Sequence, residues 1–226
     1  MSDIREEHKF LTGYLETPSF NIKLKYRVTH KGKVLVEASA PAHSPTLNLY
    51  QSWFALVAER NLGDSGGFGA SQLAVKDRGG TVRYNNSYGP HSYRVLNKPG
   101  LVTCGIAVGG GDTTYSFYDN KLASQFAHGS NTGQLYYHLA GVGDTCVPTW
   151  VSGSRVMRWE HKRDFTNLSS NAVVVKEAGL FRSLRYYSSW YWALLMMRDV
   201  ISAPVTVPAA GLFHIEYLLE TPTWPT

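Results

Sequence analysis

Three glutamates are the residues of this 226-residue chain best placed for acid–base chemistry. Glu160, Glu177 and Glu216 lie in segments that we expect to be strands, and the paired carboxylates of a glycosidase need not be close in sequence. Glu177 lies between the apolar runs Val173–Val175 and Ala178–Leu180. We therefore expect it to be nearly buried and hydrogen-bonded to backbone or to an arginine. A structural role is favoured over general acid chemistry, and no catalytic residue is assigned.

Residue types that bind metals or cofactors are present but scattered. Asp112 and Asp119 flank a glycine-rich loop and could hold a cation, but the spacing of an EF-hand is absent. That loop does not open a helix, as a dinucleotide-binding loop would. The eight histidines show no His-x-x-x-His pair, and Cys104 and Cys146 lack a CxxC pattern, which indicates two reduced, buried thiols. We expect no cofactor and no metal, and leave open only a site assembled from distant strands.

A basic stretch could contact phosphate groups. Residues Arg155–Arg163 include Trp159, which could stack on a base. Period-two alternation, however, puts Arg158, Glu160 and Lys162 on one face of a strand. That mixture of signs is typical of a solvated strand or a subunit contact, and it argues against direct nucleic-acid binding.

An aromatic segment is the most unusual feature of the chain. It contains Tyr186, Tyr187, Trp190, Tyr191 and Trp192. Aromatic rings stack on sugars, so these residues could bind a glycan. Tyr and Trp also dominate the hot spots of protein interfaces. We favour the interface interpretation, with the segment as a loop that anchors into a neighbouring subunit.

Composition limits the class of protein. Hydrophobic residues make up 43% of the chain, enough for a sizeable core, whereas charged residues make up only 17%. This balance fits a β-rich protein, and also a surface partly covered by copies or neighbours. The charged N-terminus does not resemble a signal peptide, and the longest apolar run, Trp192–Met197, is too short to span a bilayer. We therefore expect a protein made in a cytoplasm, with no membrane partner.

Alternation at the start of the chain predicts a β-hairpin. Apolar residues from Ile22 to Val28 alternate with basic residues, which is typical of a half-buried strand. The turn His30–Gly32 leads into a second strand, Lys33–Ala38. The one expected helix is Leu47–Arg60, with N-cap oxygens from Ser44 and Thr46.

Short strands bounded by turn residues recur in the second half of the chain. We expect them at Leu101–Val108, Gln134–Leu139, Val156–Phe165, Asn171–Phe181, Trp192–Val200 and Leu212–Leu219. This spacing predicts an all-β fold, an antiparallel β-sandwich or jelly roll with one short α-helix at residues 47–60. We assign residues 1–20 to an N-terminal arm and residues 21–226 to a single β-sandwich domain.

Four segments of the second half resemble a family of tailed-phage and prophage virion structural proteins. They are Gly105–Thr114 with Tyr118, Asp119 and Leu122; Ala127–Gly129 with Thr132–Tyr137; Asp164–Asn167 with Asn171–Phe181; and Leu194–Asp199 with Pro204–Gly211 and the final strand. Upstream, Val75–Thr81 is similar to the same proteins. The resemblance implies a β-sandwich that self-associates and has no known chemistry.

These observations lead us to expect a structural component of a bacteriophage virion. A capsid decoration or minor capsid protein is favoured, with a tail or neck component next. Its partners would be copies of itself and other virion proteins such as the major capsid protein, with symmetric assembly. The alternatives are a carbohydrate-binding module for host attachment and a β-sandwich glycan hydrolase.

Overall fold

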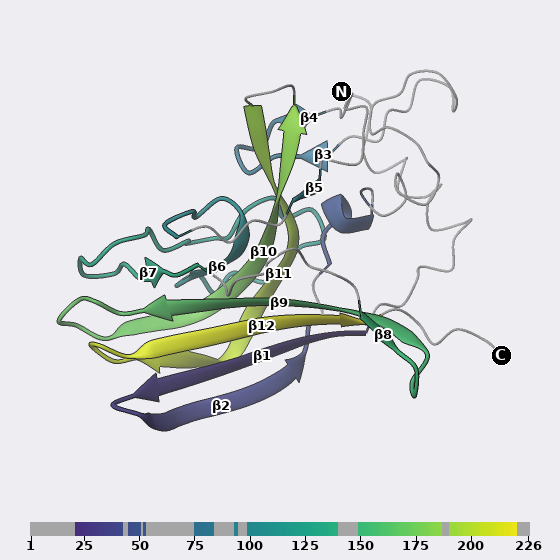
Figure 1. Cartoon of the computed structure of the whole chain (residues 1–226). Helices are drawn as coiled ribbons and strands as arrows, with labels where there is room; N and C mark the ends of the chain where they lie inside the picture. Colours follow the sequence, from purple (N-terminus) through teal and green to yellow (C-terminus); the bar gives the residue numbers. More distant parts are fainter. Residues whose placement is uncertain are drawn as a thin grey trace, which may run out of the picture.

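The computed structural model describes residues 21–42, 45–50, 52, 75–83, 93–94, 99–139, 149–186 and 190–220. These residues form antiparallel sheets, with helical residues at 47–50 and 52 (Figure 1). The all-β expectation is therefore confirmed. The arm at residues 1–20 and all but the first residues of the expected helix lie outside the described residues.

The described strands are short in the middle of the chain and long towards its end. They are β1 (Asn21–His30), β2 (Lys33–Pro41), β3 (Val75–Lys76), β4 (Val82–Arg83), β5 (Tyr93–Arg94), β6 (Gly105–Gly109), β7 (Tyr136–Tyr137), β8 (Thr149–Val151), β9 (Val156–Thr166), β10 (Val173–Tyr186), β11 (Trp190–Val207) and β12 (Leu212–Glu220).

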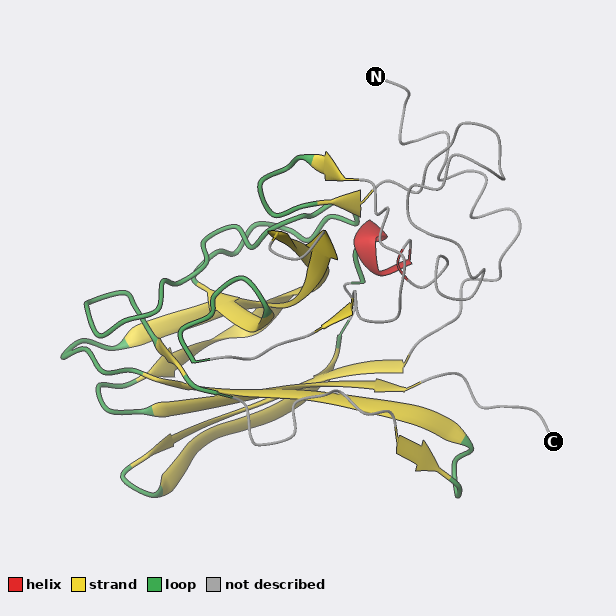
Figure 2. Cartoon of the chain, turned by 45° about the horizontal axis from the view of Figure 1, so that its top comes forward, coloured by secondary structure: helices red, strands yellow, loops and turns green. Residues whose placement is uncertain are grey.

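Two sheets pack face to face as a sandwich. The six-stranded sheet, sheet A, has the order β2-β1-β12-β9-β7, and β8 also pairs with β9. The four-stranded sheet, sheet B, has the order β11-β10-β5, and β6 also pairs with β10. Figure 2 shows sheet A as the lower layer, with sheet B above it. β3 and β4 pair with each other as a small antiparallel hairpin.

The β1–β2 hairpin confirms the alternation seen in the sequence. Ile22, Leu24, Tyr26 and Val28 are buried, whereas the basic residues between them are exposed or half-buried. The turn uses positive φ angles at Lys31 (50°) and Gly32 (75°), the combination that suits a two-residue hairpin loop. β1 therefore contributes one apolar face to the core.

The core of sheet A contains a row of aromatic rings from neighbouring strands. Tyr137, Phe165 and Phe213 are register partners on β7, β9 and β12, and the Tyr137 and Phe165 ring centroids lie 4.8 Å apart. All three are fully buried. Ile215 and Tyr217 continue the inward face of β12, as its alternation predicts. These side chains fill the space between the sheets.

Arg163, the last residue of the basic stretch, is buried inside the sandwich. His161, Arg163 and Phe165 alternate inward along β9. The Arg163 guanidinium donates from Nη1 to the carbonyl oxygens of Ile106 (2.9 Å) and Cys104 (3.2 Å), so it ties sheet A to β6 of sheet B. It has no surface for a nucleic-acid contact.

The β10–β11 hairpin is longer than the sequence predicts. The expected ends at Phe181 and Val200 are wrong, because pairing continues to Tyr186 and to Val207. The register steps from Glu177↔Val200 to Val175↔Val205, so residues 201–204 bulge and accommodate Pro204 without ending the strand.

No helix within the described residues is long and apolar enough to cross a membrane.

Candidate functional site

Residues 110–126 form a loop that lies against β10 and β11, and we call this loop the strap. Its two ends are held together, since the Gly110 N–H donates to the Ser124 carbonyl (2.9 Å). The Phe126 N–H donates to the Val108 carbonyl of β6 (3.0 Å). The strap is therefore attached to sheet B at both ends, directly over the strand that carries Glu177.

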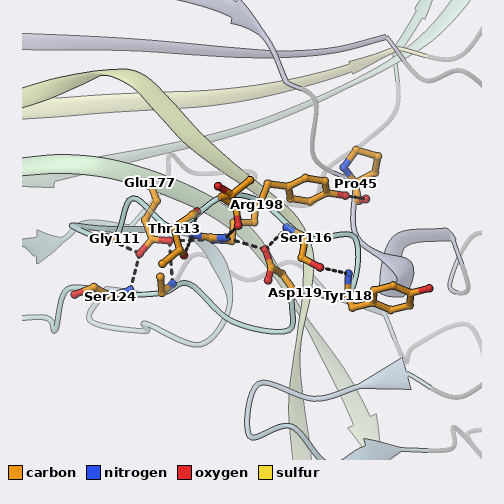
Figure 3. Close-up of polar contacts among 12 residues, drawn as sticks. Pro45, Gly111, Thr113, Ser116, Tyr118, Asp119, Ser124, Glu177 and Arg198 are labelled. Carbon is orange, nitrogen blue, oxygen red and sulfur yellow. Dashed lines mark hydrogen bonds and ion pairs between the residues drawn. The ribbon is translucent and has the colours of Figure 1, made fainter. Parts of the chain in front are cut away.

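Glu177 lies under the strap and has no exposed surface. Its carboxylate accepts hydrogen bonds from the backbone N–H groups of Ser124 (2.6 Å), Ala123 (2.9 Å) and Gly111 (3.2 Å). Figure 3 shows its side chain pointing from the sheet towards the loop. The prediction of a buried carboxylate bonded to backbone is confirmed.

Arg198 supplies the cation that this buried carboxylate needs. Its Nε donates to Glu177 (3.0 Å), its Nη1 to Asp119 (2.8 Å), and its Nη2 to the carbonyl and hydroxyl oxygens of Thr113 (3.0 and 2.9 Å). Burial by itself would lower the arginine pKa, but the bonds to Asp119 and Glu177 outweigh it and raise the pKa. The set Glu177, Arg198, Asp119 and the strap backbone is called the strap centre below.

Close packing at the strap centre explains the glycines of the loop. A Cβ atom added to Gly111 would lie 2.6 Å from both Glu177 Oε1 and the Cβ of Ala123. A Cβ on Gly109 would also lie 2.6 Å from Glu177 Oε1, and closer still to the Ser124 carbonyl oxygen. The glycines therefore allow the backbone to approach the carboxylate, which is a packing role.

The three candidate glutamates do not converge on one cleft. Glu177 belongs to sheet B and is enclosed, whereas Glu160 and Glu216 lie on the outer face of sheet A. Both flank Lys162, whose Nζ lies 2.7 Å from Glu160 and 3.8 Å from Glu216. The hydrogen bond from Lys162 lowers the pKa of Glu160. The predicted shared face of Arg158, Glu160 and Lys162 is thus a surface with paired charges.

The two aspartates considered as cation ligands pair with different basic residues. Asp112 accepts a bond from Lys176 (2.8 Å), and this bond lowers the pKa of Asp112. Asp119 pairs with Arg198 in the strap centre. Within the described ranges, no group of three or more His, Cys, Asp and Glu side chains could hold a metal ion. Cys104 is a buried free thiol, and Cys146 lies outside the described residues.

The aromatic segment is the end of the β10–β11 hairpin, so its interpretation as a loop is corrected. Tyr186 pairs with Trp190 across the end of the hairpin, and residues 184 and 185 pair with Trp192 and Tyr191. Tyr187 lies outside the described residues, and the side chains of Tyr186, Trp190 and Tyr191 are not described. Their role in an interface stays a prediction.

Trp192 already has a contact within the chain. The guanidinium of Arg83, on β4, lies 4.7 Å from the centroid of its ring, and the same arginine bonds Asp77 at 2.6 Å. This stacking links the small β3–β4 hairpin to β11. The ring is half-buried by its own chain.

The outer edge of β2, with which no other described strand pairs, is called the free edge of sheet A below, and the sequence analysis did not predict it. β2 ends the order of sheet A, and Val34, Leu35 and Val36 on it are 53%, 53% and 38% exposed. Three consecutive exposed aliphatic residues on an edge strand favour association with another chain. In the sequence, Lys33–Val36 shows no alternation of polar and apolar residues. This pattern could have indicated that some of its aliphatic side chains are exposed.

No family model matches the chain, and neither a curated protein nor a solved structure matches it at a significant level.

Proposed function

We propose that this chain is a structural subunit of a tailed-phage virion that acts through protein–protein contacts. The observation that carries the proposal is the exposed apolar run of Val34, Leu35 and Val36 on the free edge of sheet A. Such an edge presents unpaired backbone groups and aliphatic side chains together, which are the elements of a strand-mediated contact.

Two further observations support a structural role. The strap centre commits the best candidate acid, Glu177, to holding a loop on sheet B. The resemblance to virion structural proteins falls on segments that build the strap, β9–β11 and the turn before β12. Those motifs therefore build the sandwich itself. In a decoration or minor capsid protein, the sandwich would hold its edge strands in position for contacts with other subunits.

The test is mass spectrometry of purified virions from a host that expresses the chain. We expect stoichiometric amounts relative to the major capsid protein, and retention after a wash in high salt, because contacts between apolar strands are not screened. Finding the chain only in the soluble lysate fraction would contradict the proposal.

A further inference from the structure

The hydrogen-bond pattern shows which backbone groups of β2 point away from the sheet. The Ala42 N–H donates to the Ile22 carbonyl (2.8 Å), which makes residues 22 and 42 a hydrogen-bonded pair. Such pairs alternate in an antiparallel ladder, and the register continues regularly to Val28↔Val36. The N–H and C=O groups of Glu37 and Ser39 therefore point to the free edge.

The inner face of β2 extends beyond the second sheet. Val36, Ala38 and Ala40 lie opposite Val28, Tyr26 and Leu24, respectively, so they share the core-facing side of sheet A. All three partners on β1 are buried, yet Val36 and Ala40 are exposed. β2 thus continues the apolar face of the core past the edge of the sandwich.

A bulge limits the length of the straight edge. Thr29 pairs with Val34 and Val28 with Val36, so Leu35 is an extra residue without a partner on β1. Pro41, at the other end of β2, has no N–H to donate. The segment that can accept another strand is therefore short, from Val36 to Ala40.

We propose that this segment pairs with the same segment of a second copy of the chain. The two strands run antiparallel about a two-fold axis at Ala38. Glu37 then lies opposite Ser39 of the partner subunit, and each exchanges both backbone hydrogen bonds with it. Continuity of sheet A across the axis gives a closed, isologous dimer. This inference rests on the proposed structural role and supplies its first subunit contact.

Charge and backbone chemistry select this register over its neighbours. An axis at Glu37 would place two like charges opposite each other, which is destabilising. An axis at Ser39 would place Pro41 of the partner subunit opposite Glu37, where a donor is missing. With the axis at Ala38, each outward N–H of the segment has an acceptor, and small side chains meet on the inner face.

Cysteine cross-linking of the full chain tests the register. Ala38 would form a non-hydrogen-bonded pair with its own copy, with Cα atoms about 4.5 Å apart, within the range of a disulfide. Ala40 lies on the same face but about 13 Å from its own copy. We expect Ala38→Cys to give a covalent dimer on mild oxidation, and Ala40→Cys and the parent chain to stay monomeric on a non-reducing gel. Equal cross-linking of the two variants, or none of Ala38→Cys, would overturn the proposal.

A second variant tests the backbone contact without a new thiol. Ser39→Pro removes an N–H that faces the free edge and leaves the ladder to β1 intact. We expect sedimentation equilibrium to show a dimer for the parent chain and a monomer for Ser39→Pro. At concentrations low enough for the parent chain to be monomeric as well, we expect the two chains to have the same thermal midpoint. A Ser39→Pro dimer of unchanged affinity would show that another surface joins the copies. A monomeric parent chain would show that this edge does not join copies at all. Either result overturns the proposal. Mass spectrometry of virions tests only the virion role, whereas cross-linking and sedimentation test only the dimer. Either proposal can therefore be contradicted while the other holds.

Discussion

The strap centre and the outer face of sheet A each contain an arginine–glutamate pair, and the two pairs differ in burial. Arg198 lies 3.0 Å from Glu177, with side chains 2% and 0% exposed. Arg158 lies 2.6 Å from Glu220, with side chains 35% and 12% exposed. The shorter pair is thus the one whose arginine is partly accessible to water, although Glu220 itself is largely buried. The comparison teaches that the surroundings of a pair, more than its distance, set the consequence of breaking it.

The largest effect is expected from removing the buried cation. Arg198→Met leaves the Glu177 carboxylate enclosed without a counter-charge, which should lower the free energy of unfolding by about 3–5 kcal/mol. The matched change at the more accessible pair, Arg158→Met, should cost less, about 1 kcal/mol, because Arg158 is partly exposed and Asn21 still donates to Glu220. Urea denaturation followed by tryptophan fluorescence measures both values. Similar losses for the two variants would remove the distinction between the two regions.

A buried histidine should make the interior sensitive to acid. Burial lowers the pKa of His161 to about 4, compared with an ordinary value near 6.5. Between these values the unfolded chain binds a proton that the folded chain does not, so stability falls as the pH drops from about 6.5 to about 4. The loss at the acid end is on the order of 3 kcal/mol.

His161→Gln should flatten this part of the stability–pH curve. The measurement is urea denaturation at several pH values between 7.5 and 4, with the parent chain alongside. A slope that is unchanged in the variant would place the acid sensitivity elsewhere in the chain.

The strap should tolerate no side chain at its closest approach to Glu177. Gly111→Ala forces a Cβ towards the carboxylate and towards Ala123, and we expect a loss of about 1–3 kcal/mol. Gly153→Ala, where no atom lies within 4 Å of the added Cβ, should change stability by less than about 0.5 kcal/mol. Thermal melts of the two variants provide the comparison, and a neutral Gly111→Ala would mean that the strap can move away.

The smallest effect is expected on the outer face. Lys162→Met removes the ion pair to Glu160, whose side chain is 40% exposed, and a longer contact to Glu216, which keeps its ion pair with Lys25. We expect a loss below about 1 kcal/mol, and a smaller one in 1 M salt, where charges are screened within about 3 Å. A loss that persists in 1 M salt would indicate that Lys162 acts through packing of its aliphatic chain.

Alternation made the long strands of sheet A predictable, because successive side chains of a half-buried strand point alternately to the core and to water. β1 is confirmed with its inward residues and β12 is confirmed as a strand, and the burial of Glu177 followed from its apolar neighbours. The burial of Arg163 was not predicted, although the alternation places Arg163 on the same face of its strand as Phe165. The partner of Glu177 could not be found, because Arg198 is 21 residues away and depends on hairpin register.

The pairing of β1 with β12 has a consequence for how the chain acquires its structure. Asn21 lies opposite Glu220, so the first described strand cannot complete sheet A until the last one has been synthesised. Contacts between residues so distant in sequence have a high loop-closure entropy, so they form late in folding and lower the folding rate. Until then, the apolar side of the β1–β2 ribbon lacks its covering, and a nascent chain has this ribbon available for non-native pairing.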